Sequence, residues 1–193
     1  PDTKLITLCK NMCQNNILQE LPNERIFEEF NKLFLKASKP SLGLEFLKAV
    51  DSFSFFTELN MDKREWDFTL KALDACKKDI IIRLAVLCYK MYHVESFIAK
   101  LTNQKNILNQ IKKYHHVAKA LSTSSLNLQY AILKDTNFDN LSIFLKAINV
   151  STKNLQTIKP TIHGKDLVKV GFKPSSEFSK LLQLIYEIQL ISI

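Results

Sequence analysis

The chain has 193 residues, of which 46% are hydrophobic, and its formal net charge is +8. This composition is that of a folded globular protein and excludes an intrinsically disordered chain. Three glycines and five prolines are too few for strands joined by tight turns, so the composition predicts an all-α fold.

Residues 1–60 are predicted to hold three helices, which form the first unit of the chain. The helices are expected over residues 3–15, over residues 24–35, and from Pro40 to about Val50. Pro40 suits a helix start because a proline in the first turn removes no hydrogen bond. Three aromatic side chains follow and are expected to fill a core: Phe53, Phe55 and Phe56.

Residues 61–122 are predicted to form a second helical unit. Two helices are expected between residues 62 and 92, and one or two over residues 94–120. Four aspartates are interpreted as helix caps or solvated groups rather than catalytic acids: Asp62, Asp67, Asp74 and Asp79. His115 and His116 point about 100° apart on a helix, so they cannot chelate one metal ion together, and contact with solvent or phosphate is expected.

Residues 123–193 are predicted to form the third unit, a tail of helices. Helices are expected over residues 125–149, in two pieces with the second starting near Asp139, and over residues 155–158, 164–170 and 174–191. Gly164 and Gly171 bound the short helix 164–170, since glycine past a helix end adopts the left-handed conformation that other residues avoid. Pro174 is expected to begin the last helix.

Most of the positive charge lies in the second half of the chain. Residues 101–193 hold 12 lysines and 5 acidic residues, a net charge of +7, whereas residues 1–100 carry +1. Lysines without arginine suit a polyanion that is held through its phosphates rather than read base by base. A surface that only keeps the protein in solution is the alternative.

The tail helices contain the candidate RNA-binding residues, which are His163, Gly164, Lys165, Lys169, Lys173 and Lys180. Lys165 and Lys169 are four residues apart and so share one helix face. Backbone N–H groups at the start of that helix are natural phosphate ligands. The alternative is that Gly164 and Asp166 only cap the helix while the lysines are solvated. Asp166 is expected to be structural in both cases.

Four runs in the tail follow one another as a recognisable pattern. They are His163-Gly164-Lys165-Asp166-Leu167, Gly171-Phe172-Lys173-Pro174, Lys180-Leu181-Leu182 and Tyr186-Glu187-Ile188-Gln189-Leu190. This pattern resembles the C-terminal signature of bacterial tRNA nucleotidyltransferases, the CCA-adding and poly(A) polymerase family. Two departures are small: Ser175-Ser176 stands where the family often has Gly-Pro, and Ser179 stands where a glycine is usual.

Four runs near the N-terminus are similar to the neck of the same family, and their order and spacing agree with the C-terminal match. They are Leu21-Pro22-Asn23-Glu24-Arg25-Ile26, Lys32-Leu33-Phe34-Leu35, Gly43-Leu44-Glu45-Phe46-Leu47 and Phe56-Thr57-Glu58-Leu59. The resemblance implies that residues 1–60 are the neck, 61–122 the body and 123–193 the tail of such an enzyme. The chain is therefore expected to be a fragment.

The resemblance also implies what the chain does. The intact enzyme adds nucleotides to an RNA 3′ end in a catalytic head that uses Mg²⁺, CTP or ATP, and two metal-bound carboxylates, and no motif of that head occurs here. The chain alone is expected to be inactive, with no catalytic residue, metal site or cofactor. Its implied partners are the acceptor and TΨC arms of tRNA and the head, and a homodimer stays open.

Residues 64–74 and 82–91 resemble a pair of helices from the His-Asp metal phosphohydrolases. The positions of the metal-binding side chains are occupied by Phe68, Tyr89 and Lys90. None of these can replace an imidazole or carboxylate at a divalent metal, so hydrolysis by a metal-activated water is not expected. An alternative function is a helical protein-interaction or nucleotide-binding module built on this inactive core.

Cysteine usage and hydropathy predict a reduced, cytoplasmic protein. The four cysteines are Cys9, Cys13, Cys76 and Cys88. They form no Cys-x-x-Cys motif, and Cys9 and Cys13 are expected to be buried because they lie one helical turn apart. The chain shows no signal peptide and no apolar run near 18 residues, so no contact with a membrane is expected.

Overall fold

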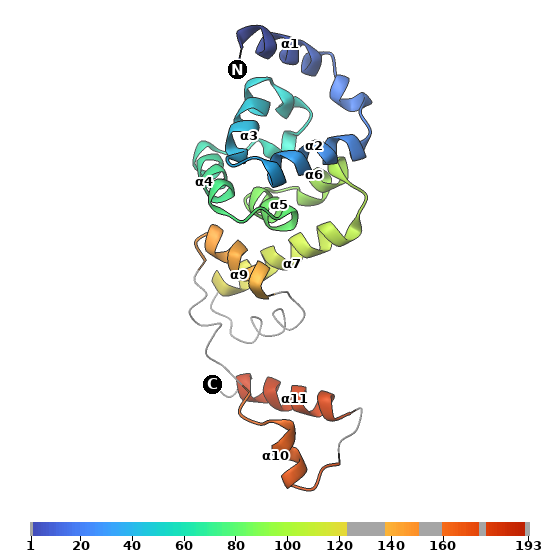
Figure 1. Cartoon of the computed structure of the whole chain (residues 1–193), viewed down its shortest axis with the longest axis vertical. Helices are drawn as coiled ribbons and strands as arrows, with labels where there is room; N and C mark the ends of the chain where they lie inside the picture. Colours follow the sequence, from blue (N-terminus) through green and yellow to red (C-terminus); the bar gives the residue numbers. More distant parts are fainter. Residues whose placement is uncertain (1, 123–137, 151–159, 174–176, 192–193) are drawn as a thin grey trace.

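The computed structural model describes residues 2–122, 138–150, 160–173 and 177–191, and every regular element in these ranges is a helix. The predicted all-α fold is confirmed. The α-helices are α1 (Thr3–Gln14), α2 (Asn23–Lys36), α3 (Pro40–Ala49), α4 (Lys63–Ala75), α5 (Ile80–Cys88), α6 (Val94–Leu101), α7 (Lys105–Ser122), α9 (Phe138–Ala147), α10 (Gly164–Lys169) and α11 (Phe178–Ile191). Three short 3₁₀ helices are η1 (Ile17–Glu20), η2 (Ser52–Ser54) and η3 (Thr57–Leu59). Figure 1 shows an elongated array, with α1 at one end and α10 and α11 at the other.

Aspartate and proline set the helix starts that the sequence predicts. Asp62 Oδ1 accepts a hydrogen bond from the backbone N–H of Glu65 at 2.9 Å, and Asp79 Oδ1 accepts one from Ile82 at 3.0 Å. Each bond satisfies an N–H group that the helix itself leaves without a partner. Pro40 lies in the first turn of α3, as expected.

Asp74 caps a helix other than its own. Its carboxylate accepts hydrogen bonds from the backbone N–H of Ser41 at 3.0 Å and from the Ser41 hydroxyl at 2.6 Å. The α4 side chain thereby holds the first turn of α3. The interpretation of these aspartates as caps is confirmed for Asp62, Asp74 and Asp79, and Asp67 is exposed.

One hydrophobic core runs from α2 to α9. Its aromatic centre is Phe30, whose ring lies edge-on to Phe34, Phe56 and Phe97 at centroid distances of 5.7, 5.6 and 6.0 Å. Phe53 and Phe56 are buried as expected, and Phe55 is half-buried against Phe56. The core is continuous across residue 60, where the neck was predicted to meet the body.

Helix α9 covers the far side of this core, where it packs against α4, α5 and α7 (Figure 1). Three side chains of α9 are buried, Leu141, Phe144 and Leu145, and so is Ile148, which directly follows the helix. Phe144 stacks on Tyr114 of α7 at 5.5 Å. The first of the two helices predicted over residues 125–149, and the one predicted over residues 155–158, lie outside the described residues.

A buried arginine joins three helices. Arg83 of α5 is 1% exposed; its Nη1 donates to the carbonyl oxygen of Phe34 and its Nη2 donates to that of Cys76 at 3.3 Å. Lys78 Nζ donates to the carbonyl oxygen of Lys36 at 3.1 Å. The C-terminal end of α2 therefore receives two cations, which the helix dipole favours.

Several expectations need correction. Cys13 is buried as expected, but Cys9 is only half-buried, and Leu5, Leu8 and Met12 on the same helix are exposed. Helix α5 ends at Cys88 rather than near Tyr92. Burial raises the pKa of the Cys13, Cys76 and Cys88 thiols, which makes them poor nucleophiles.

The prediction for His115 is wrong. Its ring lies in the core face of α7, where Nε2 is 2.8 Å from the carbonyl oxygen of Ala85 and the imidazole stacks on Phe144. His116 is exposed, as expected. Separately, none of the described helices combines the length and the hydrophobicity that crossing a lipid bilayer requires.

Candidate nucleic-acid interface

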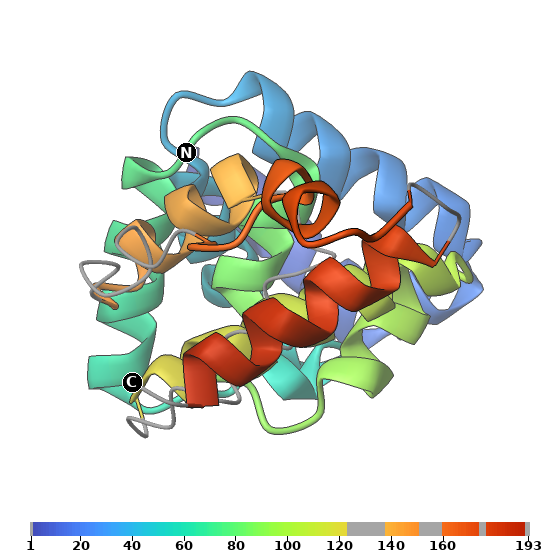
Figure 2. The ribbon, with the colours of Figure 1, turned by 90° about the horizontal axis from the view of Figure 1, so that it is seen from below.

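The tail pair, defined as α10 and α11, lies at one end of the molecule. Helix α11 runs across the long axis, whereas α10 runs nearly along it (Figures 1 and 2). Pro174 and the two serines after it lie outside the described residues, and Glu177 is in a turn, so the last helix begins at Phe178 and not at Pro174.

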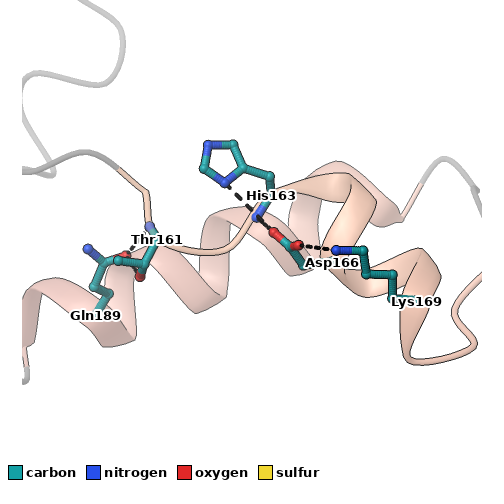
Figure 3. A network of polar contacts seen from close by, with 5 residues as sticks. All are labelled: Thr161, His163, Asp166, Lys169 and Gln189. Atoms are coloured by element: carbon teal, nitrogen blue, oxygen red, sulfur yellow. Dashed lines mark hydrogen bonds and ion pairs between the residues drawn. The ribbon is translucent and has the colours of Figure 1, made fainter.

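Helix α10 begins with a capping interaction between His163 and Asp166. The backbone N–H of His163 donates to Asp166 Oδ2 at 3.0 Å (Figure 3). This hydrogen bond, together with the charges of Lys169 and Lys165, lowers the pKa of the Asp166 carboxyl. A carboxylate in the first turn is also favoured by the helix dipole. Asp166 therefore has the structural role that was expected of it.

Close packing explains the glycine at position 164. A Cβ atom there would lie 3.3 Å from the ring of Phe178 and 3.8 Å from Leu182, both on α11. A second link joins the same two segments, since the backbone N–H and the hydroxyl of Thr161 donate to Gln189 Oε1 at 2.9 and 2.7 Å (Figure 3). Gly164 is thus a point of contact between the two helices, which the sequence did not reveal.

Helix α10 ends in a Schellman motif. Gly171 has a φ of 97°. The backbone N–H of Phe172 donates to the carbonyl oxygen of Leu167 at 3.1 Å, and the backbone N–H of Gly171 donates to that of Val168 at 3.0 Å. These two hydrogen bonds, with a glycine in the left-handed conformation, satisfy carbonyl groups that the end of the helix leaves without a partner. The predicted stop at Gly171 is confirmed. The turn projects Phe172 and Lys173 from the surface, and both are exposed.

The structure gathers two of the four predicted lysines around one hollow. Lys173 and Lys180 line a recess of about 350 Å³, here called the tail recess, together with Phe172, Phe178 and Glu177. Phe172 is 50% exposed. An exposed ring that lines the same recess as two lysines is compatible with binding of an unpaired base and its phosphate. Phe172 was not among the predicted binding residues, although it lies within the Gly171-Phe172-Lys173 run.

The remaining predicted residues lie on α10. Lys165 and Lys169 are exposed, and Lys169 Nζ lies 3.7 Å from Asp166 Oδ1 (Figure 3). Within the described ranges, it is the only one of the four tail lysines in an ion pair, and this exposed pair contributes little to stability. The His163 side chain is exposed beside them. All six candidate residues are therefore on or next to the tail pair.

The three positions predicted to replace metal ligands also meet in space. The ammonium group of Lys90 lies 5.9 Å from the ring centroid of Phe68 and 5.1 Å from that of Tyr89. This group is here called the Lys90 cluster. In the part of the chain that is described, no three His, Cys, Asp or Glu side chains come close enough together to hold a metal ion.

No protein-family model, curated protein or solved structure matches this chain. The tail pair and the Lys90 cluster are therefore the features from which a function can be inferred. The tail pair offers exposed cations beside an aromatic ring, and the Lys90 cluster offers a cation where metal chemistry would need ligands. The first arrangement suits a nucleic-acid backbone.

Proposed function

We propose that this chain is the RNA-binding part of a tRNA nucleotidyltransferase of the CCA-adding and poly(A) polymerase family. Its tail pair would hold the acceptor and TΨC arms of tRNA so that the RNA 3′ end reaches a catalytic head. The observation that carries the proposal is the tail recess, which is lined by Lys173, Lys180 and the exposed ring of Phe172. In this proposal the protein acts in the cytoplasm, and the head supplies Mg²⁺ and binds CTP or ATP.

The lysines account for the attraction to RNA. Each exposed ammonium group that meets a phosphate releases a counterion from the RNA, so binding weakens as salt rises. Lys165 on α10 extends the charge of the tail recess along the same end of the molecule. Duplex RNA hides its bases in a deep groove, so a surface of lysines recognises its backbone and shape.

The neck supports the proposal through the packing of its quoted runs. Asn23 Nδ2 donates to the carbonyl oxygen of Ala99 at 2.8 Å, which fixes the start of α2 against α6. A Cβ atom at Gly43 would overlap the side chain of Leu33, so α2 and α3 approach closely there. Residues of two separate runs, Leu33 and Gly43, thus meet in one contact, as expected if the resemblance reflects a shared fold.

Binding of the chain to tRNA that lacks its CCA end tests the proposal. The comparison is duplex DNA of equal charge, at two salt concentrations. We expect a preference for tRNA with a steep salt dependence, weakened about tenfold by the double variant Lys165→Ala, Lys173→Ala. The matched control is Lys63→Ala, Lys105→Ala, which removes the same charge from exposed positions at the starts of α4 and α7.

Two outcomes would count against the proposal. Equal and weak binding to both nucleic acids would mean that the charge is generic. An equal loss in the tail variant and in the control variant would mean that the tail pair has no special part in binding. Either result would favour the alternative, a helical interaction or nucleotide-binding module.

A further inference from the structure

A pocket of about 470 Å³ lies between α4 and α9, on the body of the molecule rather than on the tail pair. Helix α4 contributes Phe68 and Lys71 to its lining, and helix α9 contributes Ile143 and Lys146. The volume falls in the range of pockets that bind small molecules.

The charge of the pocket is positive on both walls. Lys71 comes from α4 and Lys146 from α9, and the lining contains no aspartate or glutamate among the described residues. Neither lysine forms an ion pair within the described ranges. Lys90 does not line the pocket, but its ammonium group lies 5.9 Å from the ring centroid of Phe68, which does. Two uncompensated ammonium groups on facing helices suit a phosphate group.

The rest of the pocket is apolar and includes one aromatic ring. Phe68 is half-buried, and small side chains such as Ala72 and Ala147 leave room beside it. A planar base packs well against an aromatic ring and aliphatic groups. At the rim, Asn149 offers an amide that both donates and accepts hydrogen bonds. An anion with a flat aromatic part therefore fits better than an inorganic ion or a purely apolar ligand.

We propose that the pocket between α4 and α9 binds a nucleoside monophosphate, with its base against Phe68 and its phosphate between Lys71 and Lys146. The ligand is a free mononucleotide or one unpaired nucleotide of a bound RNA, which present the same chemistry. The site goes beyond the proposed function of the tail pair and does not depend on it.

Calorimetric titration of the full chain with AMP tests this site. Adenosine and inorganic phosphate are the two partial ligands, and a short single-stranded oligoadenylate is the polymeric one. The variants are Lys71→Met and Lys146→Met, which remove the charge and keep the apolar part of the side chain. The control is Lys63→Met, which removes an exposed charge two turns earlier on α4. Thermal melting shows whether each variant stays folded.

We expect saturable binding of AMP that weakens about tenfold in each of the two pocket variants and is unchanged in the control. Adenosine and phosphate should each bind much more weakly than AMP. Tighter binding of the oligoadenylate would identify RNA as the source of the nucleotide. Absence of AMP binding at millimolar concentration, or wild-type affinity for AMP in the folded Lys71→Met and Lys146→Met variants, would overturn the proposal.

The two proposals can fail separately. The tail variant Lys165→Ala, Lys173→Ala should leave AMP affinity unchanged, because neither lysine lines this pocket. Conversely, if the chain showed no preference for tRNA over duplex DNA, AMP binding in the pocket between α4 and α9 would still be expected.

Discussion

The Nε2 atom of His115 lies 2.8 Å from the carbonyl oxygen of Ala85, so a histidine of α7 is bound to the backbone of α5. Its ring also stacks on Phe144 of α9 at 5.9 Å. Burial lowers the pKa of His115, and the hydrogen bond to Ala85 opposes this effect without cancelling it. The imidazole is therefore neutral in the folded chain at neutral pH, with its Nε2–H donating.

Stability should fall as the pH drops from about 7 toward 5. The unfolded chain takes up a proton on His115 near its ordinary pKa of about 6.5, whereas the folded chain resists protonation because its pKa is lower. Unfolding therefore binds a proton in this range, and acid favours the unfolded state. Urea denaturation at several pH values should show that the free energy of unfolding decreases as the pH falls, and His115→Gln should make this decrease smaller. The exposed neighbour His116→Gln is the control, and an equal change in both variants would contradict the assignment.

Substitution of Gly164 should loosen the tail pair. In Gly164→Val the added methyl groups would press on Phe178, which a Cβ already approaches at 3.3 Å. We expect a local cost of about 1–3 kcal/mol and faster hydrogen exchange in α11, with no change in α4 and α5. Val168→Ala, at an exposed position on the same helix, is the control. Unchanged exchange in α11 would show that the contact does not hold the two helices together.

Loss of the Glu58 and Lys100 ion pair should destabilise the core. The Glu58 side chain is 4% exposed, and its Oε2 lies 2.8 Å from Lys100 Nζ. Burial would raise the pKa of Glu58, but hydrogen bonds from Lys100 and Ser96 lower it overall. Lys100→Met leaves this carboxylate without its cation, so we expect a loss of about 2–4 kcal/mol in the free energy of unfolding. Lys105→Met is the exposed control, and equal stability of the two variants would contradict the prediction.

The same pair predicts a second, more acidic pH effect. Because the folded pKa of Glu58 is lowered, its contribution to stability is present above the unfolded pKa of about 4.3 and is lost as the pH falls through the folded value. Between about pH 5 and pH 3, the free energy of unfolding of Glu58→Gln should therefore change less with pH than that of the wild-type chain. Glu24→Gln, at an exposed position, should keep the wild-type sensitivity.

Two substitutions in the tail recess should separate charge from stacking. Lys173→Ala should weaken tRNA binding and reduce the slope of log affinity against log salt by about one, since one phosphate contact is lost. Phe172→Ala should weaken binding by about 1–3 kcal/mol with the slope unchanged, because base stacking releases no counterion. Affinity measured over a salt series distinguishes the two. A reduced slope in Phe172→Ala would argue against stacking.

The positions of the helices were predictable because local chemistry sets them. Asp62 and Asp79 satisfy the first N–H groups of α4 and α5, and Pro40 begins α3, so the signal lies in the sequence next to each helix. The burial of His115 was not predictable, because it depends on α5 and α9, which are distant in the sequence. The same holds for Gly164, whose packing partner Phe178 lies beyond the Schellman turn.

The positive charge of the tail could be predicted from the sequence, but the shape of the tail recess could not. The lysines of the tail stand out in the sequence because no arginine accompanies them. The tail recess depends on the turn that places Phe172 beside Lys180, and the pocket between α4 and α9 depends on helices far apart in the chain. Neither hollow has a local sequence signal.

The late position of α9 has a consequence for synthesis on the ribosome. Helix α5 ends at Cys88, and α9, which covers one side of it beside α7, begins only at Phe138. Until α9 has been made and has left the ribosome, this almost wholly apolar helix lacks the side chains of Leu141, Phe144 and Leu145 that complete its burial. Nascent chains with exposed apolar surface are prone to aggregate. Chains that stop before α9 should therefore depend on chaperones more than chains that include it.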